Sequence, residues 1–199
     1  MFIQIIQGRC TRPDELHALV DTWREELAPG APGWLGGTYG FTDDDQFVGV
    51  VRFDSRDSAM ANSERTEQGA WAERMMALMD GPVEFHDCDD VTLMMDGGRD
   101  DAGFVQIIRG RVEDTDRLKA LMTDTDLLHE VRPEIIGGTL AIEDDGTFTE
   151  TIAFTSEAAA REGEKKDMPD MPESERETMR QMLKEATFYD LHHPWFASA

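Results

Sequence analysis

The chain contains 199 residues, of which 40% are hydrophobic and 31% are charged. This composition is typical of a folded globular protein and excludes an intrinsically disordered one. The formal net charge at pH 7 is −23, and so acidic a surface would repel phosphate backbones and anionic lipid headgroups. We therefore expect neither a nucleic-acid partner nor a membrane partner.

The acidity is shared along the chain, because residues 1–98 carry 19 acidic and 7 basic side chains and the remainder carries 23 and 12. A high net charge usually provides solubility, and an acidic face for a cationic partner is the alternative interpretation. No apolar run is long enough to span a bilayer, and the first residues lack the basic-then-apolar order of a signal peptide. We expect a cytoplasmic protein. Cys10 and Cys88 are the only cysteines, too few for a disulfide framework.

Taken in chain order, the first half alternates between strand patterns and helix patterns. Residues 2–9 form a near-continuous apolar run that predicts a strand buried on both faces. Helical spacing then places the apolar residues between Leu16 and Leu27 on one face. The predicted elements are strand 2–9, a helix that begins after the N-cap Thr11 and ends at Leu27, a hairpin of strands 34–41 and 46–53, a helix at 57–79 with a break near Gly69, and strand 83–95.

The second half repeats the first. Residues 104–111 (FVQIIRGR) echo residues 2–9 (FIQIIQGR), and Gly36-Gly37-Thr38 returns as Gly137-Gly138-Thr139. Two copies are too few for a solenoid and indicate a duplicated domain. We expect repeats at 1–98 and 99–199, joined by a Gly-rich linker. The elements expected in the second copy are strand 104–112, helix 114–130, hairpin 135–154, a helical region at 156–185 interrupted by prolines, and strand 186–192.

Each copy therefore follows the order β-α-β-β-α-β, which is the ferredoxin-like arrangement of the α+β class. Its helices cover one face of an antiparallel sheet and leave the other face apolar and bare. The tandem copy can cover that face. We expect the two repeats to pack sheet to sheet as an intramolecular pseudo-dimer, with further homo-oligomerisation left open.

The doubled order of elements resembles the dimeric α+β barrel superfamily, and within it the antibiotic-biosynthesis-monooxygenase-like (ABM) domains, here as a fused pair. The resemblance depends on the opening strands, the Gly-Gly-Thr strands and the entries Phe53-Asp54-Ser55 and Phe154-Thr155-Ser156 into the second helix of each copy. The superfamily includes cofactor-free oxygenases, haem-degrading enzymes and proteins without known activity, so the fold alone assigns no activity.

The resemblance implies a ligand pocket between the helices and the sheet of a copy. Cofactor-free oxygenation needs an apolar, aromatic-lined pocket and a few polar groups directed at a developing oxyanion. Each candidate also has a structural interpretation, since buried amides are normally hydrogen-bonded and aromatic residues at helical spacing usually belong to a core. The candidates are Gln4, Gln7, Trp23 and Trp71 in the first copy, and Gln106 and Arg109 in the second.

We expect no metal and no cofactor. In the haem-degrading members a histidine on the second helix ligates iron, and the matching positions here fall near Trp71 and Pro172, neither of which can ligate a metal. The five histidines, His129 among them, are scattered without a metal-ligand spacing.

Two functions from different classes follow, and haem binding is left open as a third. One is a cofactor-independent monooxygenase acting on a small aromatic or apolar substrate. The other is a non-catalytic protein that binds small molecules or acts as a scaffold, with degenerate pockets and the acidic surface as its working part.

Overall fold

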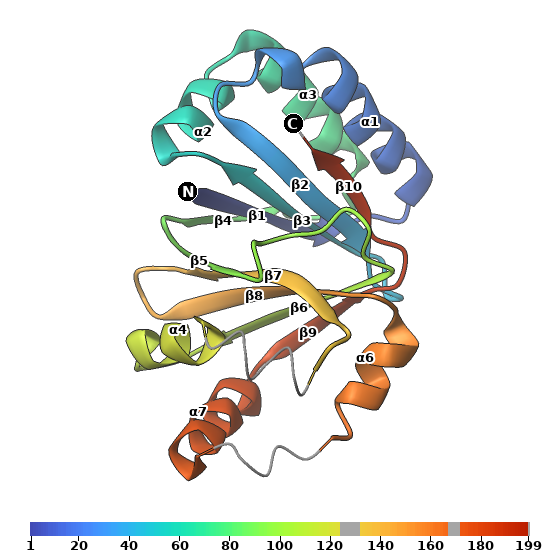
Figure 1. The fold of residues 1–199 in the computed structure, drawn as a ribbon. Coiled ribbons are helices and arrows are strands. Elements are labelled where there is room, and N and C mark those ends of the chain that lie inside the picture. Colours follow the sequence, from blue (N-terminus) through green and yellow to red (C-terminus); the bar gives the residue numbers. More distant parts are fainter. Residues whose placement is uncertain (124–131, 167–171, 199) are drawn as a thin grey trace. The chain divides into compact units, whose positions relative to one another are not determined.

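The computed structural model describes residues 1–123, 132–166 and 172–198, and divides into two compact units (Figure 1). The first unit comprises Met1–Asp89 together with the C-terminal segment from Trp195, and the second comprises Asp90–Pro194. Each unit contains one five-stranded antiparallel sheet.

The first unit contains the β-α-β-β-α-β order with a divided second helix and one added strand. Its sheet order is β10-β2-β3-β1-β4, in which the last four strands have the ferredoxin-like arrangement. The elements are β1 (Phe2–Arg9), α1 (Pro13–Glu26), the short 3₁₀ helix η1 (Ala28–Gly30), β2 (Trp34–Phe41), β3 (Gln46–Phe53), α2 (Arg56–Ser63), α3 (Thr66–Leu78), β4 (Glu84–Cys88) and β10 (Trp195–Ser198).

The second unit repeats this arrangement with the sheet order β5-β7-β8-β6-β9. Its elements are β5 (Asp90–Met94), β6 (Phe104–Arg111), α4 (Thr115–Thr123), β7 (Ile135–Ile142), β8 (Thr147–Phe154), α6 (Glu157–Gly163), α7 (Glu173–Lys184) and β9 (Thr187–Leu191). The α+β class and the two ferredoxin-like repeats are thereby confirmed. The sheet-to-sheet arrangement of the repeats stays a prediction.

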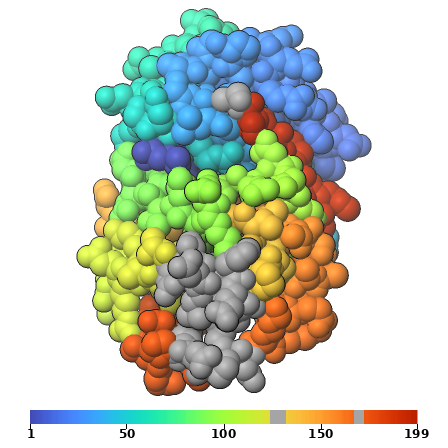
Figure 2. Space-filling view, in the orientation of Figure 1, coloured from blue at the N-terminus to red at the C-terminus, as the bar shows by residue number. Residues whose placement is uncertain are grey.

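Each repeat gives its last strand segment to the sheet of the other unit. The strand predicted at 83–95 is wrong as a single element, because β4 pairs with β1 whereas β5 pairs with β7. In the same way β9 pairs with β6, and β10 pairs with β2 of the first unit. Figure 2 shows this red C-terminal strand on the surface beside blue residues of the first unit. The compact units therefore differ in extent from the repeats expected at 1–98 and 99–199.

The second helix of the first repeat breaks four residues before the predicted position. The backbone leaves the helix at Arg65, which is extended, and Gly69 lies inside α3. Arg65 holds the break, because its guanidinium donates to the carbonyl oxygen of Leu27 and to the side chain of Asn62. Of the helix predicted at 114–130, α4 accounts for the part up to Thr123, and the remainder, with His129, lies outside the described residues.

The two glycine pairs lie at irregularities of the sheets. A register shift separates Trp34 from Gly36 in β2, and an equivalent shift separates Ile135 from Gly137 in β7. A bulge of this kind bends the strand and increases its twist.

Strand alternation assigns each side chain of a sheet to one of two faces. In β1, Phe2 and Ile6 belong to the hydrophobic cluster that includes residues of α1 and α3. In β6, Phe104 and Ile108 belong to the corresponding cluster with α4 and α7. We call this side of each sheet the helix face, and it is where the expected pocket would lie.

Candidate functional site

Gln4 is part of a polar network at the edge of the first sheet. Its amide Nε2 donates to a carboxylate oxygen of Asp87 on the neighbouring strand β4, at 2.9 Å. The guanidinium of Arg56, the first residue of α2, lies 3.6 Å from the other oxygen of Asp87 and 4.9 Å from the ring centroid of Phe2. Through Asp87, Gln4 of β1 is therefore linked to β4 and to Arg56 at the N-terminus of α2.

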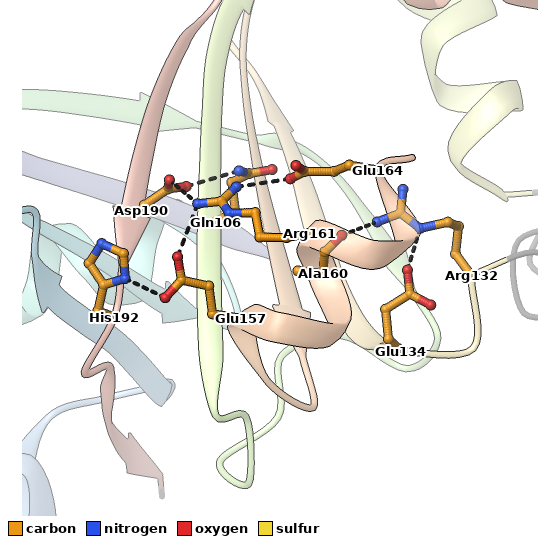
Figure 3. Close-up of polar contacts among 9 residues, drawn as sticks. All are labelled: Gln106, Arg132, Glu134, Glu157, Ala160, Arg161, Glu164, Asp190 and His192. Atoms are coloured by element: carbon orange, nitrogen blue, oxygen red, sulfur yellow. Dashed lines mark hydrogen bonds and ion pairs between the residues drawn. The ribbon is translucent and has the colours of Figure 1, made fainter. Parts of the chain in front are cut away.

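Gln106 occupies the same position in the second unit, and its surroundings are shown in Figure 3. Its amide donates to Asp190 at 2.9 Å, and Asp190 also accepts a hydrogen bond from Arg161 of α6. The Arg161 guanidinium lies 5.2 Å from the ring centroid of Phe104. The same combination of amide, carboxylate, arginine and phenyl ring is thus present in both units.

The arginine of this network has moved along its helix between the repeats. Arg56 directly follows the N-cap residue Ser55, whereas the residue after the N-cap Ser156 is Glu157 and the arginine comes one turn later. Glu157 lies 2.8 Å from Nδ1 of His192 and 3.4 Å from Arg161 (Figure 3). These ion pairs are about a third exposed at Arg161 and Asp190, so we interpret the network as a structural clamp between α6 and β9.

A second ion pair lies near the C-terminal end of α6. Arg132 donates through Nε to Glu134, whose side chain is only 7% exposed. The Arg132 guanidinium also lies near the carbonyl oxygen of Ala160 (Figure 3). Gly163 permits this arrangement, because a Cβ at Gly163 would overlap the carboxylate of Glu134 and lie 2.5 Å from Nε of Arg132.

The candidate tryptophans of the first unit lie together beneath its helices. The rings of Trp23 and Trp71 are 6.3 Å apart, and Trp34 packs edge-on at 5.1 Å from Trp23. Trp23 donates its indole N–H to Gln68 at 2.6 Å, and Trp71 donates to the carbonyl oxygen of Leu19 at 2.9 Å. All three rings are buried in the core cluster, and both candidate indoles use their polar atom inside the protein.

Gln7 and Arg109 lie on the face of their sheets opposite to the helix face. Each is an odd number of residues from Gln4 or Gln106, so strand alternation directs it to the other side. Gln7 is 6% exposed, and its Nε2 has no hydrogen-bond partner among the described residues. Arg109 donates to Thr149 at 2.8 Å and to Glu143 at 2.7 Å. Within each unit, the candidates therefore lie on both faces of the sheet.

An aromatic stack fills the helix face of the first unit next to β10. Tyr39 of β2 lies 5.8 Å from Trp195 of β10 and 6.4 Å from Phe47, and His17 of α1 stacks on Trp195 at 4.3 Å. Burial raises the pKa of Tyr39 well above its ordinary value, so the phenol stays protonated. The sequence analysis did not single out this stack, because Trp195 joins it only through the strand exchange.

Glu150 was also not among the site residues predicted from the sequence. It is 4% exposed in β8, between cross-strand neighbours Ile108 and Leu140 on the helix face. Burial raises the pKa of Glu150 to about 7. A signal was present in the sequence, since aligning Phe47 with Phe148 places a glutamate opposite a glycine, between the apolar residues Phe148 and Ile152 two positions away on either side.

No group of three or more potential ligands among the described residues is arranged to hold a metal ion. None of the helices in the described ranges is both long enough and apolar enough to cross a bilayer.

No protein-family model and no curated protein matches the chain, but solved structures do. A candidate monooxygenase from Lactobacillus acidophilus NCFM aligns over 100% of this chain and 97% of its own, with a TM-score of 0.73 and 13% identity. A candidate monooxygenase from Fusobacterium nucleatum subsp. nucleatum ATCC 25586 covers 96% of this chain and 90% of its own, with a TM-score of 0.72 and 8% identity. An anthrone oxidase-like protein covers 100% and 94%, with a TM-score of 0.67 and 11% identity.

TM-scores of 0.67–0.73 establish the shared fold, and identities of 8–13% leave the activity open. The similarity runs through both repeats, which confirms the resemblance stated from the sequence. The chain therefore shares its fold, two ferredoxin-like α+β repeats in tandem, with these three solved structures.

Proposed function

We propose that this protein is a cofactor-independent monooxygenase that acts on a small aromatic or apolar substrate. The observation that carries the proposal is the full-length similarity of fold to the candidate monooxygenases and to the anthrone oxidase-like protein. The helix face of each sheet is lined mainly by apolar side chains, as a site for such substrates requires.

The reaction class explains what the protein would have to supply. An electron-rich substrate such as an anthrone reacts with dioxygen after it loses a proton. Its methylene carbon becomes a carbonyl, one oxygen atom enters the product, and the other leaves as water. The substrate provides the electrons, so the protein needs to bind it, accept the proton and exclude bulk water from the reacting carbon.

Oxygen uptake tests the proposal. The purified protein is mixed with anthrone, and separately with a polycyclic quinol, in an oxygen electrode, and the product formed in isotopically labelled dioxygen is analysed by mass spectrometry. We expect protein-dependent uptake and one labelled oxygen atom in the product. Uptake no faster than without protein, for both substrate classes, would reject the monooxygenase.

A non-catalytic binding or scaffold protein is the second candidate, and one observation favours it for the first unit. The indole N–H groups of Trp23 and Trp71 are both satisfied internally, and their rings belong to a filled core. Binding of anthrone without oxygen uptake, measured by quenching of tryptophan fluorescence, would support this candidate.

A further inference from the structure

Glu150 lies in surroundings that do not suit a carboxylate. Its cross-strand neighbours are Ile108 and Leu140, and the residues two positions away on its own strand are Phe148 and Ile152. All four are buried members of the hydrophobic cluster of the second unit. The helices contribute to the same cluster through Leu118, Met122 and Met182.

The Glu150 carboxyl forms no hydrogen bond and no ion pair with the described part of the chain, although the side chain is 4% exposed. A buried carboxylate without a partner is costly, and such a group normally holds a proton or meets a ligand. Structural carboxylates of this unit behave differently. Glu134, which is also buried, is paired with Arg132.

The fold itself does not require a glutamate at this position. The equivalent residue of the first unit is Gly49, whose cross-strand neighbours Ile6 and Tyr39 match Ile108 and Leu140. A Cβ at Gly49 would lie 3.1 Å from the ring of Tyr39, so the aromatic stack already occupies this space.

The second unit lacks that stack. Tyr39 is replaced by Leu140, and Trp195, which pairs with Tyr39, is replaced by Thr92, which pairs with Leu140. Thr92 is only half-buried. Two large rings are therefore absent from these positions, and the ionisable group added beside them is the carboxyl of Glu150.

From this arrangement we propose that the helix face of the second unit binds a neutral, flat aromatic molecule with a weakly acidic C–H or O–H bond, and that Glu150 removes its proton. The inference deepens the proposed monooxygenase function and rests on it. In the step, the substrate C–H or O–H bond breaks, its electron pair stays on the substrate, and the proton forms an O–H bond with a Glu150 carboxylate oxygen.

The acid–base properties of Glu150 suit this role. Burial raises the pKa of Glu150 to about 7, and a general base is most effective when its pKa lies near the working pH. Among the described residues, no charged group faces Glu150 from the elements around it. Arg109 and Arg111 of β6 lie on the opposite face, β7 has no ionisable residue, and the residues that α4 and α7 bury are Leu118, Met122, Thr178 and Met182.

Proton abstraction can be measured without oxygen turnover. Anthrone is incubated anaerobically in deuterated buffer with the full-length protein, and deuterium entering its methylene group is followed by mass spectrometry. We compare the wild type with Glu150→Gln and with Glu113→Gln, which removes an exposed carboxylate of the same unit. Thermal unfolding checks that each variant is folded, and Glu150→Leu replaces the amide variant if Glu150→Gln does not fold.

The wild type should accelerate exchange, with a rate that rises with pH and levels off above about 7. Glu150→Gln should slow the protein-dependent rate by about 100-fold or more and abolish this pH dependence, whereas Glu113→Gln should match the wild type. The proposal is overturned if the wild type does not accelerate exchange, or if Glu150→Gln or Glu150→Leu exchanges as fast as the wild type.

Admitting oxygen afterwards separates the two proposals. If deuterium exchange depends on Glu150 but no oxygen is consumed, the proposed base is supported and the monooxygenase is rejected. Oxygen uptake that is equally fast in Glu150→Gln would retain the monooxygenase and reject Glu150 as its base.

Discussion

At the scale of single residues, the two repeats differ at a position where their strand registers match. Gly49 and Glu150 have equivalent neighbours on both flanking strands, yet one has no side chain and the other has a carboxyl. Because the sheet forms with either residue at this position, folding alone does not require a glutamate there. The difference therefore points to what each unit does, and it has a measurable consequence for stability.

Glu150 should make stability depend on pH. The folded-state pKa of about 7 lies above the ordinary value of 4.5, so the folded protein binds the proton more tightly than the unfolded chain. Stability should fall as pH rises from 4.5 to about 7 and then level off, with a total loss of about 3 kcal/mol. Glu150→Gln should remove this part of the pH profile of the unfolding free energy in urea, and Glu113→Gln should retain it. A profile that Glu150→Gln leaves unchanged contradicts the assignment.

Gly163 should be intolerant of even a methyl group. An added Cβ would overlap the Glu134 carboxylate and displace its ion pair with Arg132. Gly163→Ala should therefore lower the unfolding free energy by about 1–3 kcal/mol. Gly69→Ala is the matched control, because nothing lies within 4 Å of a Cβ at this position of α3, and we expect a gain of about 0.5–1 kcal/mol. Equal effects of the two changes on urea unfolding would contradict the steric argument.

At the scale of secondary-structure elements, α2 and α6 begin in the same way. Ser55 and Ser156 are extended N-cap residues whose hydroxyl oxygens accept from the backbone N–H of Ser58 and Ala159, each at 3.2 Å. The caps fix where each helix starts, and thereby where Arg56 or Arg161 meets the edge of its sheet.

Loss of one cap should be costly. Ser156→Ala should reduce the unfolding free energy by about 1 kcal/mol, since it leaves a helix N–H without its acceptor. Ser174→Ala, at an exposed position in the first turn of α7, should change it by less than about 0.5 kcal/mol. Calorimetric melting of both variants tests this. If both shift the transition equally, the cap of α6 is not contributing.

Most elements could be predicted from the sequence, because their signals are local. The repeat of FVQIIRGR, the apolar stripe from Leu16 to Leu27 and the Gly-Gly bulges each depend on residues near in the chain. The break at Arg65 was misplaced because it is stabilised by a contact with Leu27, which is distant in sequence. The division of strand 83–95 was missed because hydrophobic periodicity carries no information about which strand edge a segment joins.

The candidate site was harder to predict than the fold. Gln4 and Gln106 are polar interruptions of apolar strands and could be found, but their partners Asp87 and Asp190 lie more than 80 residues away. Trp23 and Trp71 have the pattern of either a core or a pocket, and only their internal hydrogen bonds distinguish the two.

At the scale of the whole molecule, β10 closes an edge of the first sheet. It pairs with β2 from Trp195 to Ser198 and brings the Trp195 ring onto Tyr39 and Phe41. Without it, β2 would expose a row of unpaired backbone groups, which favours association with other chains.

Truncation after Pro194 should therefore lower stability by about 3 kcal/mol or more and promote self-association. Trp195→Ala is the matched variant, since it removes the ring and keeps the backbone pairing, and it should destabilise the protein without causing association. Urea unfolding and size-exclusion chromatography distinguish the two effects. A truncated protein that is monomeric and as stable as the full chain would contradict the role of β10.

The covalent fusion of the two repeats also changes what a mutation can do. In an assembly of identical subunits every substitution appears in both sheets, so a carboxyl that helps one compartment must be accommodated by the other as well. Here a substitution changes only one of the two sheets, because the sheets are built from different residues of one chain. The first sheet can therefore keep an aromatic core while the second carries an ionisable group. A symmetric dimer of identical chains cannot separate these two properties.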